Sequence, residues 1–78
     1  MNNSNTESIE SVFATLLDVL FAIQNMIKIC EILTIGLEAR SESFGIAIIK
    51  SQKIILLSLA SQLKDIIIKL EPLLDPIE

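Results

Sequence analysis

Residues 9–37 read IESVFATLLDVLFAIQNMIKICEILTIGL, and this stretch decides the fold. Apolar side chains recur within it in alternating steps of four and three residues, the spacing of one side of an α-helix that packs against another helix. We call this series the first seam. Its members are Ile9, Phe13, Leu16, Leu20, Ile23, Ile27, Cys30, Thr34 and Leu37. All except Thr34 are apolar, so the pattern predicts a long helix with a packed side.

A second apolar series runs beside the first on the same segment. Its members are Val12, Val19, Ala22, Met26, Ile29 and Leu33. One neighbouring helix covers one seam, so two seams require two neighbouring helices. The chain has room for only one other long helix. We therefore expect it to complete its core against another chain.

The first helix has recognisable start and stop signals. Ser4 and Glu7 have the spacing of a capping box, in which the two side chains bond to free amides at the start of a helix. Gly36 is the first residue after them that favours a helix end, because glycine readily adopts the left-handed conformation. Thr6 is a competing N-cap, and because Leu37 continues the first seam, the helix could run on to about Arg40. We predict a disordered tail over residues 1–6 and a helix over about 7–36.

A second helix follows a short polar turn. Residues 46–71 contain no Gly, Pro or Asn, which favours helix over strands, because strands would need turn residues between them. Pro72 limits this helix, since the residue before a proline is disfavoured in helical geometry. The predicted segments are a turn over about 36–43, a helix over about 44–70 and an irregular tail over 71–78. The predicted seam of this helix is Ile49, Gln52, Leu56, Leu59, Leu63, Ile66 and Leu70.

These elements predict an all-α fold. Two long helices joined by a short turn form an antiparallel hairpin, and two stacked hairpins cover both seams of each helix. A chain of 78 residues is in the size range where a lone core is marginal and oligomerisation is common. We therefore predict a four-helix bundle built by a homodimer, the commonest symmetry for identical chains. The polar seam members Thr34 and Gln52 either specify the register of a partner or, for Gln52, face water near the turn.

No residue pattern points to catalysis, a metal or a cofactor. Histidine is absent and Cys30 is the only cysteine, so the ligand sets of structural zinc sites and of carboxylate–histidine bundle sites are missing. Cys30 lies in the first seam, where core packing accounts for it. Asp18 and Asp65 lie on polar stripes that we expect to face solvent. We expect no enzyme activity, no metal and no cofactor.

Charge and hydropathy restrict the partners. The net charge of −4 disfavours nucleic acid, although Arg40, Lys50 and Lys53 near the turn keep a small nucleic-acid-binding regulator as a lesser alternative. The longest uncharged run of the second helix, 54–63, is shorter than the ~18 residues of a membrane span, so we expect no span. The start of the chain is polar and acidic, unlike a signal peptide, which favours a cytoplasmic protein.

The expected function follows from the uncovered seam. Contiguous apolar surface that a chain cannot cover itself marks a protein–protein interface. We expect an interaction or adaptor module that binds itself or another helical protein. The alternative is a partner-dependent chaperone or inhibitor that binds a helix of another protein. Phe21 lies outside both seams, and a large aromatic there is expected to need cover. The expected interface residues are Phe13, Leu16, Leu20, Phe21, Ile23, Met26, Ile27, Leu56, Leu59 and Leu63.

Overall fold

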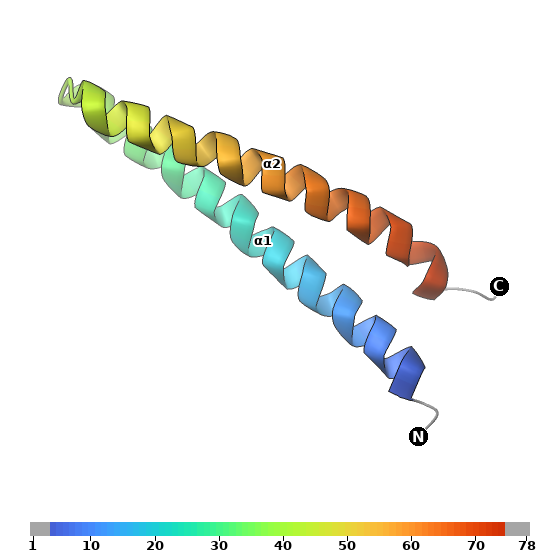
Figure 1. The fold of residues 1–78 in the computed structure, drawn as a ribbon. Coiled ribbons are helices and arrows are strands. Elements are labelled where there is room, and N and C mark those ends of the chain that lie inside the picture. Colours follow the sequence, from blue (N-terminus) through green and yellow to red (C-terminus); the bar gives the residue numbers. More distant parts are fainter. Residues whose placement is uncertain (1–3, 75–78) are drawn as a thin grey trace.

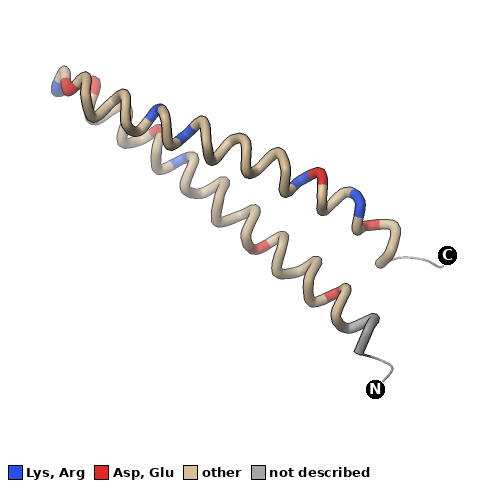
Figure 2. Tube along the Cα trace, viewed as in Figure 1, with Lys and Arg blue, Asp and Glu red and all other residues tan. Residues whose placement is uncertain are grey.

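Two antiparallel helices form a long hairpin. The computed structural model describes the backbone of residues 4–74 and the side chains of residues 8–74. Helix α1 spans Ser4–Ala39 and helix α2 spans Ser43–Leu74, and the turn lies at one end of a rod of 58 × 18 × 17 Å (Figure 1). The predicted all-α hairpin is confirmed for these residues. Charged residues occur along both helices, from the turn towards the free ends (Figure 2).

Helix α1 extends beyond its predicted range at both ends. It begins at Ser4, inside the segment predicted to be disordered, and continues through Gly36 to Ala39. Residues 1–3 lie outside the described part. A glycine inside a helix costs only about 1 kcal/mol relative to alanine. Leu37, the last member of the first seam, lies so close to Gly45 of α2 that a Cβ atom there would be 3.2 Å from its Cδ2. Packing beyond Gly36 therefore offsets the cost of the glycine.

The turn is shorter than predicted and is closed by a Schellman motif. The Glu42 amide donates to the Leu37 carbonyl at 3.0 Å, and the Ser41 amide donates to the Glu38 carbonyl at 3.1 Å. This pair of bonds requires a left-handed residue, and Ser41 supplies it with φ of 58°. The Ile46 amide then bonds to the Glu42 carbonyl at 3.0 Å, so α2 starts immediately after the motif. Neither Gly36 nor Gly45 has a positive φ, so neither glycine provides the reversal.

Helix α2 continues through Pro72 to Leu74, where we predicted an irregular tail. A proline lacks the amide that would bond to the carbonyl four residues earlier, here that of Ile68. In the last turn of a helix this removes a single hydrogen bond. Leu70 and Leu74 continue the packed side of α2 and are half-buried, which favours helix up to that point. Residues 75–78 lie outside the described part.

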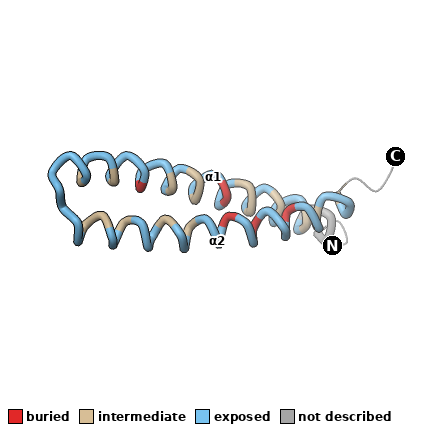
Figure 3. The backbone as a smooth tube through the Cα atoms, turned by 90° about the horizontal axis from the view of Figure 1, so that it is seen from above, coloured by how far each residue is buried: buried red, intermediate tan, exposed pale blue. Residues whose placement is uncertain are grey.

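The core is the line of contact between the two helices, and the buried residues lie where the helices face each other (Figure 3). Every member of the first seam is buried or half-buried, so this part of the prediction is confirmed. The main cluster joins Leu20 of α1 to Ala60, Leu63 and Ile67 of α2, each no more than 9% exposed. No side chain in the described part is less than 2% exposed, which shows that the core is only one layer thick.

The packed side of α2 differs from the predicted seam at every second position. The observed members are Ile46, Ile49, Lys53, Leu56, Ala60, Leu63, Ile67, Leu70 and Leu74. Predicted members Gln52, Leu59 and Ile66 are exposed, and in each case the next residue faces α1 instead. The prediction is wrong at these three positions. The small side chain of Ala60 lets α2 approach Leu20 closely. The spacing of apolar residues, on which the prediction rested, did not reveal this packing advantage.

Candidate interaction surface

The hairpin exposes more surface than a folded chain of its mass normally does. Its accessible area is 5826 Å², whereas a folded monomer of 8.6 kDa is expected to expose about 4,700 Å². Many large apolar side chains contribute to this area, with exposed fractions from 42% for Val19 to 80% for Phe44. Exposed apolar surface of this extent is typical of protein-binding and of membrane-binding surfaces.

One group of these residues forms a continuous strip, which we call the apolar face. From α1 it contains the second seam, and all six of its residues are exposed. From α2 it contains a matching series beside the packed side. The members of the apolar face are Val12, Val19, Ala22, Met26, Ile29 and Leu33 of α1 and Ile48, Ile55, Leu59, Ile66 and Leu73 of α2. The prediction that the second seam stays uncovered by its own chain is therefore confirmed.

The two halves of the apolar face lie on the same side of the hairpin. In α1, Val19 directly precedes the buried Leu20, and in α2, Leu59 directly precedes the buried Ala60. A step back of one residue rotates the side chain by about 100° in the same sense in any right-handed helix. When two such helices run antiparallel and face each other, this rotation turns both side chains towards the same side. The strip is therefore two helices wide.

Charge is confined to the two ends of the apolar face. Arg40 lies at its turn end and Lys69 near its free end, and no charged residue lies on the strip between them. Thr15, Gln52 and Gln62 are its uncharged polar positions. Buried centres of protein interfaces are depleted in charge in the same way, with polar groups towards the rim.

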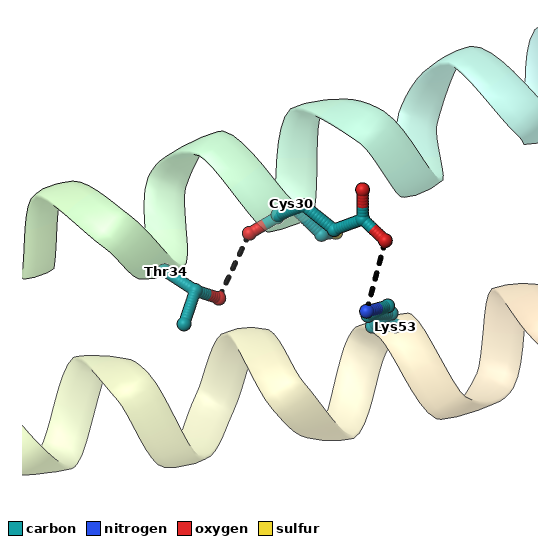
Figure 4. Close-up of polar contacts among 4 residues, drawn as sticks. Cys30, Thr34 and Lys53 are labelled. Atoms are coloured by element: carbon teal, nitrogen blue, oxygen red, sulfur yellow. Dashed lines mark hydrogen bonds and ion pairs between the residues drawn. The ribbon is translucent and has the colours of Figure 1, made fainter. Parts of the chain in front are cut away.

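The opposite side of the hairpin carries most of the charge. The residues there are Glu10, Lys28, Glu31, Glu38, Lys50, Lys64 and Glu71. Lys53, from the packed side of α2, reaches Glu31 of α1, with Nζ 3.0 Å from Oε2 (Figure 4). Both side chains are partly exposed. This side also exposes apolar residues, including Phe21, Ile35 and Ile54, interspersed with lysines and glutamates.

The ten predicted interface residues fall into three groups. Seven of them pack inside the hairpin and are covered by the chain itself. Those seven are Phe13, Leu16, Leu20, Ile23, Ile27, Leu56 and Leu63. Met26 and Leu59 lie on the apolar face, 48% and 45% exposed. Phe21 is 59% exposed but lies on the charged side, outside both contact surfaces.

Three residues of the apolar face, all in α2, were assigned neither to a seam nor to the interface from the sequence. They are Leu73, which lies in the predicted irregular tail, and the pair Ile48 and Ile55. The two isoleucines are exposed beside the packed side of α2. Their spacing of seven residues was visible in the sequence, but their side of the hairpin depends on which residues of α2 face α1. Once Ala60 rather than Leu59 faces α1, the rotation of α2 places both isoleucines next to the second seam.

The polar and reactive residues of the first seam are accounted for by packing. Cys30 is 8% exposed. Thr34 Oγ1 donates a hydrogen bond of 2.8 Å to the Cys30 carbonyl in its own helix (Figure 4). Its hydroxyl is therefore satisfied without a residue from another helix. Among the described residues, no three His, Cys, Asp or Glu side chains are grouped as metal ligands.

The basic residues near the turn do not form one patch. Lys53 is paired with Glu31, Lys50 lies on the charged side, and Arg40 lies at the end of the apolar face. Acidic residues Glu38 and Glu42 are interspersed with them. A nucleic-acid site normally concentrates positive charge on one side, and this arrangement does not.

Both helices are long and apolar enough to cross a membrane, judged by length and composition alone. The segments are Ser8–Ala39 and Ser43–Leu74, and only 6% and 11% of their most apolar windows are buried in the hairpin. The prediction of no membrane span is therefore not supported, because it relied on the length of uncharged runs rather than on overall hydropathy. Core helices of soluble proteins pass the same test.

The sequence was compared with protein-family models, with curated proteins and with solved structures, and no significant match was found.

Proposed function

We propose that this protein is a small, non-enzymatic interaction module that acts in the cytoplasm as a homodimer, with two hairpins joined through their apolar faces into a four-helix bundle. The apolar face is the observation that carries the proposal. Both helices contribute to it, and it lacks charge between Arg40 and Lys69. A second copy presents a strip of the same length, width and polarity, so the two strips are suited to cover each other.

The angle between the two packed sides of α1 supports a four-helix arrangement. Val19 and Leu20 represent the second and first seams and are adjacent in sequence, so their side chains diverge by about 100°. A helix in a four-helix bundle contacts two neighbours at roughly a right angle. One neighbour is α2 of the same chain, and the second position is open to a partner helix.

The area available for burial is also sufficient. The hairpin exposes about 1,100 Å² more than the expected area for its mass, and covering that excess on two chains buries roughly 2,200 Å² in total. Obligate homodimer interfaces begin at about 2,000 Å². The surface of the whole chain therefore leaves room for an interface of the size that stable homodimers bury.

The register of the hairpin favours this assembly over a membrane hairpin. Leu37 lies beside Gly45, and Glu31 reaches Lys53, so residues at equal distance from the turn face each other. The least charged part of α1, 11–28, then lies at the level of about 55–72 of α2, which holds Lys64, Asp65, Lys69 and Glu71. Each charged residue at the centre of a bilayer costs about 2.5–3.5 kcal/mol on insertion scales.

The least charged part of α2 meets the same difficulty. Residues 46–63 contain Lys50 and Lys53 and face about 20–37 of α1, which holds Lys28 and Glu31. No single depth places both helices in an uncharged layer. A water-soluble bundle instead buries the apolar face and leaves the charged side in solvent.

The first test uses circular dichroism to measure the unfolding midpoint of the purified chain over a wide range of protein concentration. A homodimer is stabilised by mass action, so its midpoint must rise with concentration. Light scattering after size exclusion must show about twice the chain mass of 8.6 kDa. A folded monomer with a constant midpoint contradicts the proposal. A chain that is soluble only with detergent supports the membrane alternative, and one that folds only with a co-expressed protein supports the partner-dependent chaperone or inhibitor.

A matched pair of variants tests the surface itself. Ile54 and Ile55 are adjacent and both well exposed, 67% and 52%, but Ile55 lies on the apolar face and Ile54 lies on the charged side. Ile55→Asp is expected to abolish the dimer, and Ile54→Asp to leave it intact. Ile55→Ala, which keeps helix propensity, is expected to weaken dimerisation without unfolding the hairpin at high concentration. Equal effects of the two aspartate variants contradict the assignment of the face.

A further inference from the structure

We infer that the two hairpins of the dimer lie with their turns at opposite ends, so that α1 packs on α1 of the partner and α2 on α2. This inference rests on the proposed homodimer. Two-fold symmetry allows two ways to stack hairpins face to face. If the turns lie at the same end, α1 packs on the partner's α2. If they lie at opposite ends, each helix packs antiparallel on its own counterpart.

The residue sizes on the α1 half of the apolar face favour opposite ends. The positions from the free end to the middle carry small side chains, and those from the middle to the turn carry large ones. A two-fold axis midway between Ala22 and Met26 pairs the three small residues nearest the centre of one copy with large residues of the other, and beyond them Val12 meets Gly36. The pairs are Ala22 with Met26, Val19 with Ile29, and Thr15 with Leu33. Alternating small and large residues across facing positions is the condition for a densely packed core.

The α2 half of the apolar face independently gives the same centre. An axis midway between Ile55 and Leu59 pairs these two residues between the copies, Gln52 with Gln62, and Ile48 with Ile66. Apolar residues then meet apolar residues, and the glutamines meet each other. Within one hairpin, Leu20 of α1 shares a buried cluster with Ala60 and Leu63 of α2, so these two centres lie at nearly the same level. A single axis therefore satisfies both helices.

Turns at the same end produce poorer matches. Residues at the same distance from the turn then face each other between chains, as they do within the hairpin. Ile29 of one copy then meets Gln52 of the other, and Val19 meets Gln62. Lys69 falls against Val12 near the free end. This arrangement leaves polar groups against apolar ones.

Spin-label distances on the full chain distinguish the two arrangements. One label is attached at Glu42→Cys in the exposed turn and another, in a separate variant, at Asn25→Cys on the outer surface of α1, both with Cys30→Ala so that each chain carries one label. For opposite ends, the turn labels are roughly 50 Å apart, because about 34 residues of helical rise separate them. The Asn25 labels are then within about 20 Å, since neighbouring helices lie 8–10 Å apart.

For turns at the same end the turn labels are the closer pair and the Asn25 labels the more distant pair. The turn labels come within about 25 Å, and the Asn25 labels lie on diagonally opposite helices at about 30 Å or more. That result overturns the inferred arrangement and leaves the homodimer standing. The absence of dipolar coupling at both sites, with helicity retained by circular dichroism, instead shows that there is no dimer and removes the basis of both proposals.

Discussion

Lys53 of α2 reaches across the hairpin to Glu31 of α1, with Nζ 3.0 Å from Oε2. Lys53 belongs to the packed side of α2, and all the remaining residues of that side are apolar. The lysine is 34% exposed and the glutamate 51%. Ion pairs exposed to this degree contribute between about 0 and 1 kcal/mol. The lysine stem therefore packs along α1, and its ammonium group extends to the edge of the contact.

Replacing Lys53 by methionine is expected to stabilise the hairpin by about 1 kcal/mol, because the added apolar burial exceeds the value of the ion pair. Urea unfolding at fixed protein concentration measures the change. Lys50→Met, on the exposed charged side, is the matched control and is expected to change stability by less than about 0.5 kcal/mol. A loss of stability in Lys53→Met, relieved by Glu31→Gln, would show instead that the ion pair dominates.

Ser41→Gly is expected to raise the stability of the turn by about 1 kcal/mol. Ser41 has φ of 58° and closes the Schellman motif, and a residue with a Cβ atom costs roughly 1–2 kcal/mol in that conformation. The higher entropy of glycine in the unfolded chain offsets part of the gain. Thermal unfolding measures the effect. Ser43→Gly is the control, since Ser43 lies in the first turn of α2 and glycine there is expected to be destabilising.

On the α1 side of the core the sequence predicted every first-seam residue but not Leu17, which also packs against the main cluster, and it predicted the α2 side only in part. In α1 the first seam continues without a gap from Ile9 to Leu37, which distinguishes it from the shorter second seam. In α2, apolar residues flank the packed line on both sides, so Leu59 and Ala60 were both compatible with a helical repeat. The choice depends on how closely α2 approaches Leu20, which is a property of the packed pair. The choice between Leu59 and Ala60 also decides which residues of α2 lie on the apolar face.

Thr34→Val is expected to leave assembly unchanged and to keep stability the same or raise it by up to about 1 kcal/mol. The Thr34 hydroxyl bonds at 2.8 Å to the Cys30 carbonyl of its own helix, so its loss leaves no group on another helix unpaired. Light scattering and urea unfolding check this expectation. A change in oligomer size would instead assign Thr34 a role in specifying the partner, as polar residues in coiled-coil seams have.

Leu20→Ala is expected to destabilise the protein by about 2–5 kcal/mol, because Leu20 is 7% exposed at the centre of the main cluster. Stability losses of that size approach the whole stability of a small domain, so helicity is expected to fall at low protein concentration. Leu57→Ala removes the same atoms at a position that is 48% exposed on the charged side. Its effect is expected to stay below about 1 kcal/mol, and similar losses in both variants would contradict the position of the core.

Exchanging Ala22 and Met26 tests the pairing of small with large residues by stability alone. In the opposite-ends dimer, Ala22 of one chain faces Met26 of the other, so Ala22→Met places two methionines in contact and Met26→Ala leaves a void. Each single variant is expected to lose roughly 1–3 kcal/mol of dimer stability. The double variant restores one alanine and one methionine in every pair and is expected to recover most of the loss. If the turns lie at the same end, the two positions face different residues of α2 and the two losses should add. The same variants are also measured at protein concentrations below those at which the dimer forms. Any coupling energy between positions 22 and 26 within one helix appears there, and it is subtracted from the coupling energy measured in the dimer.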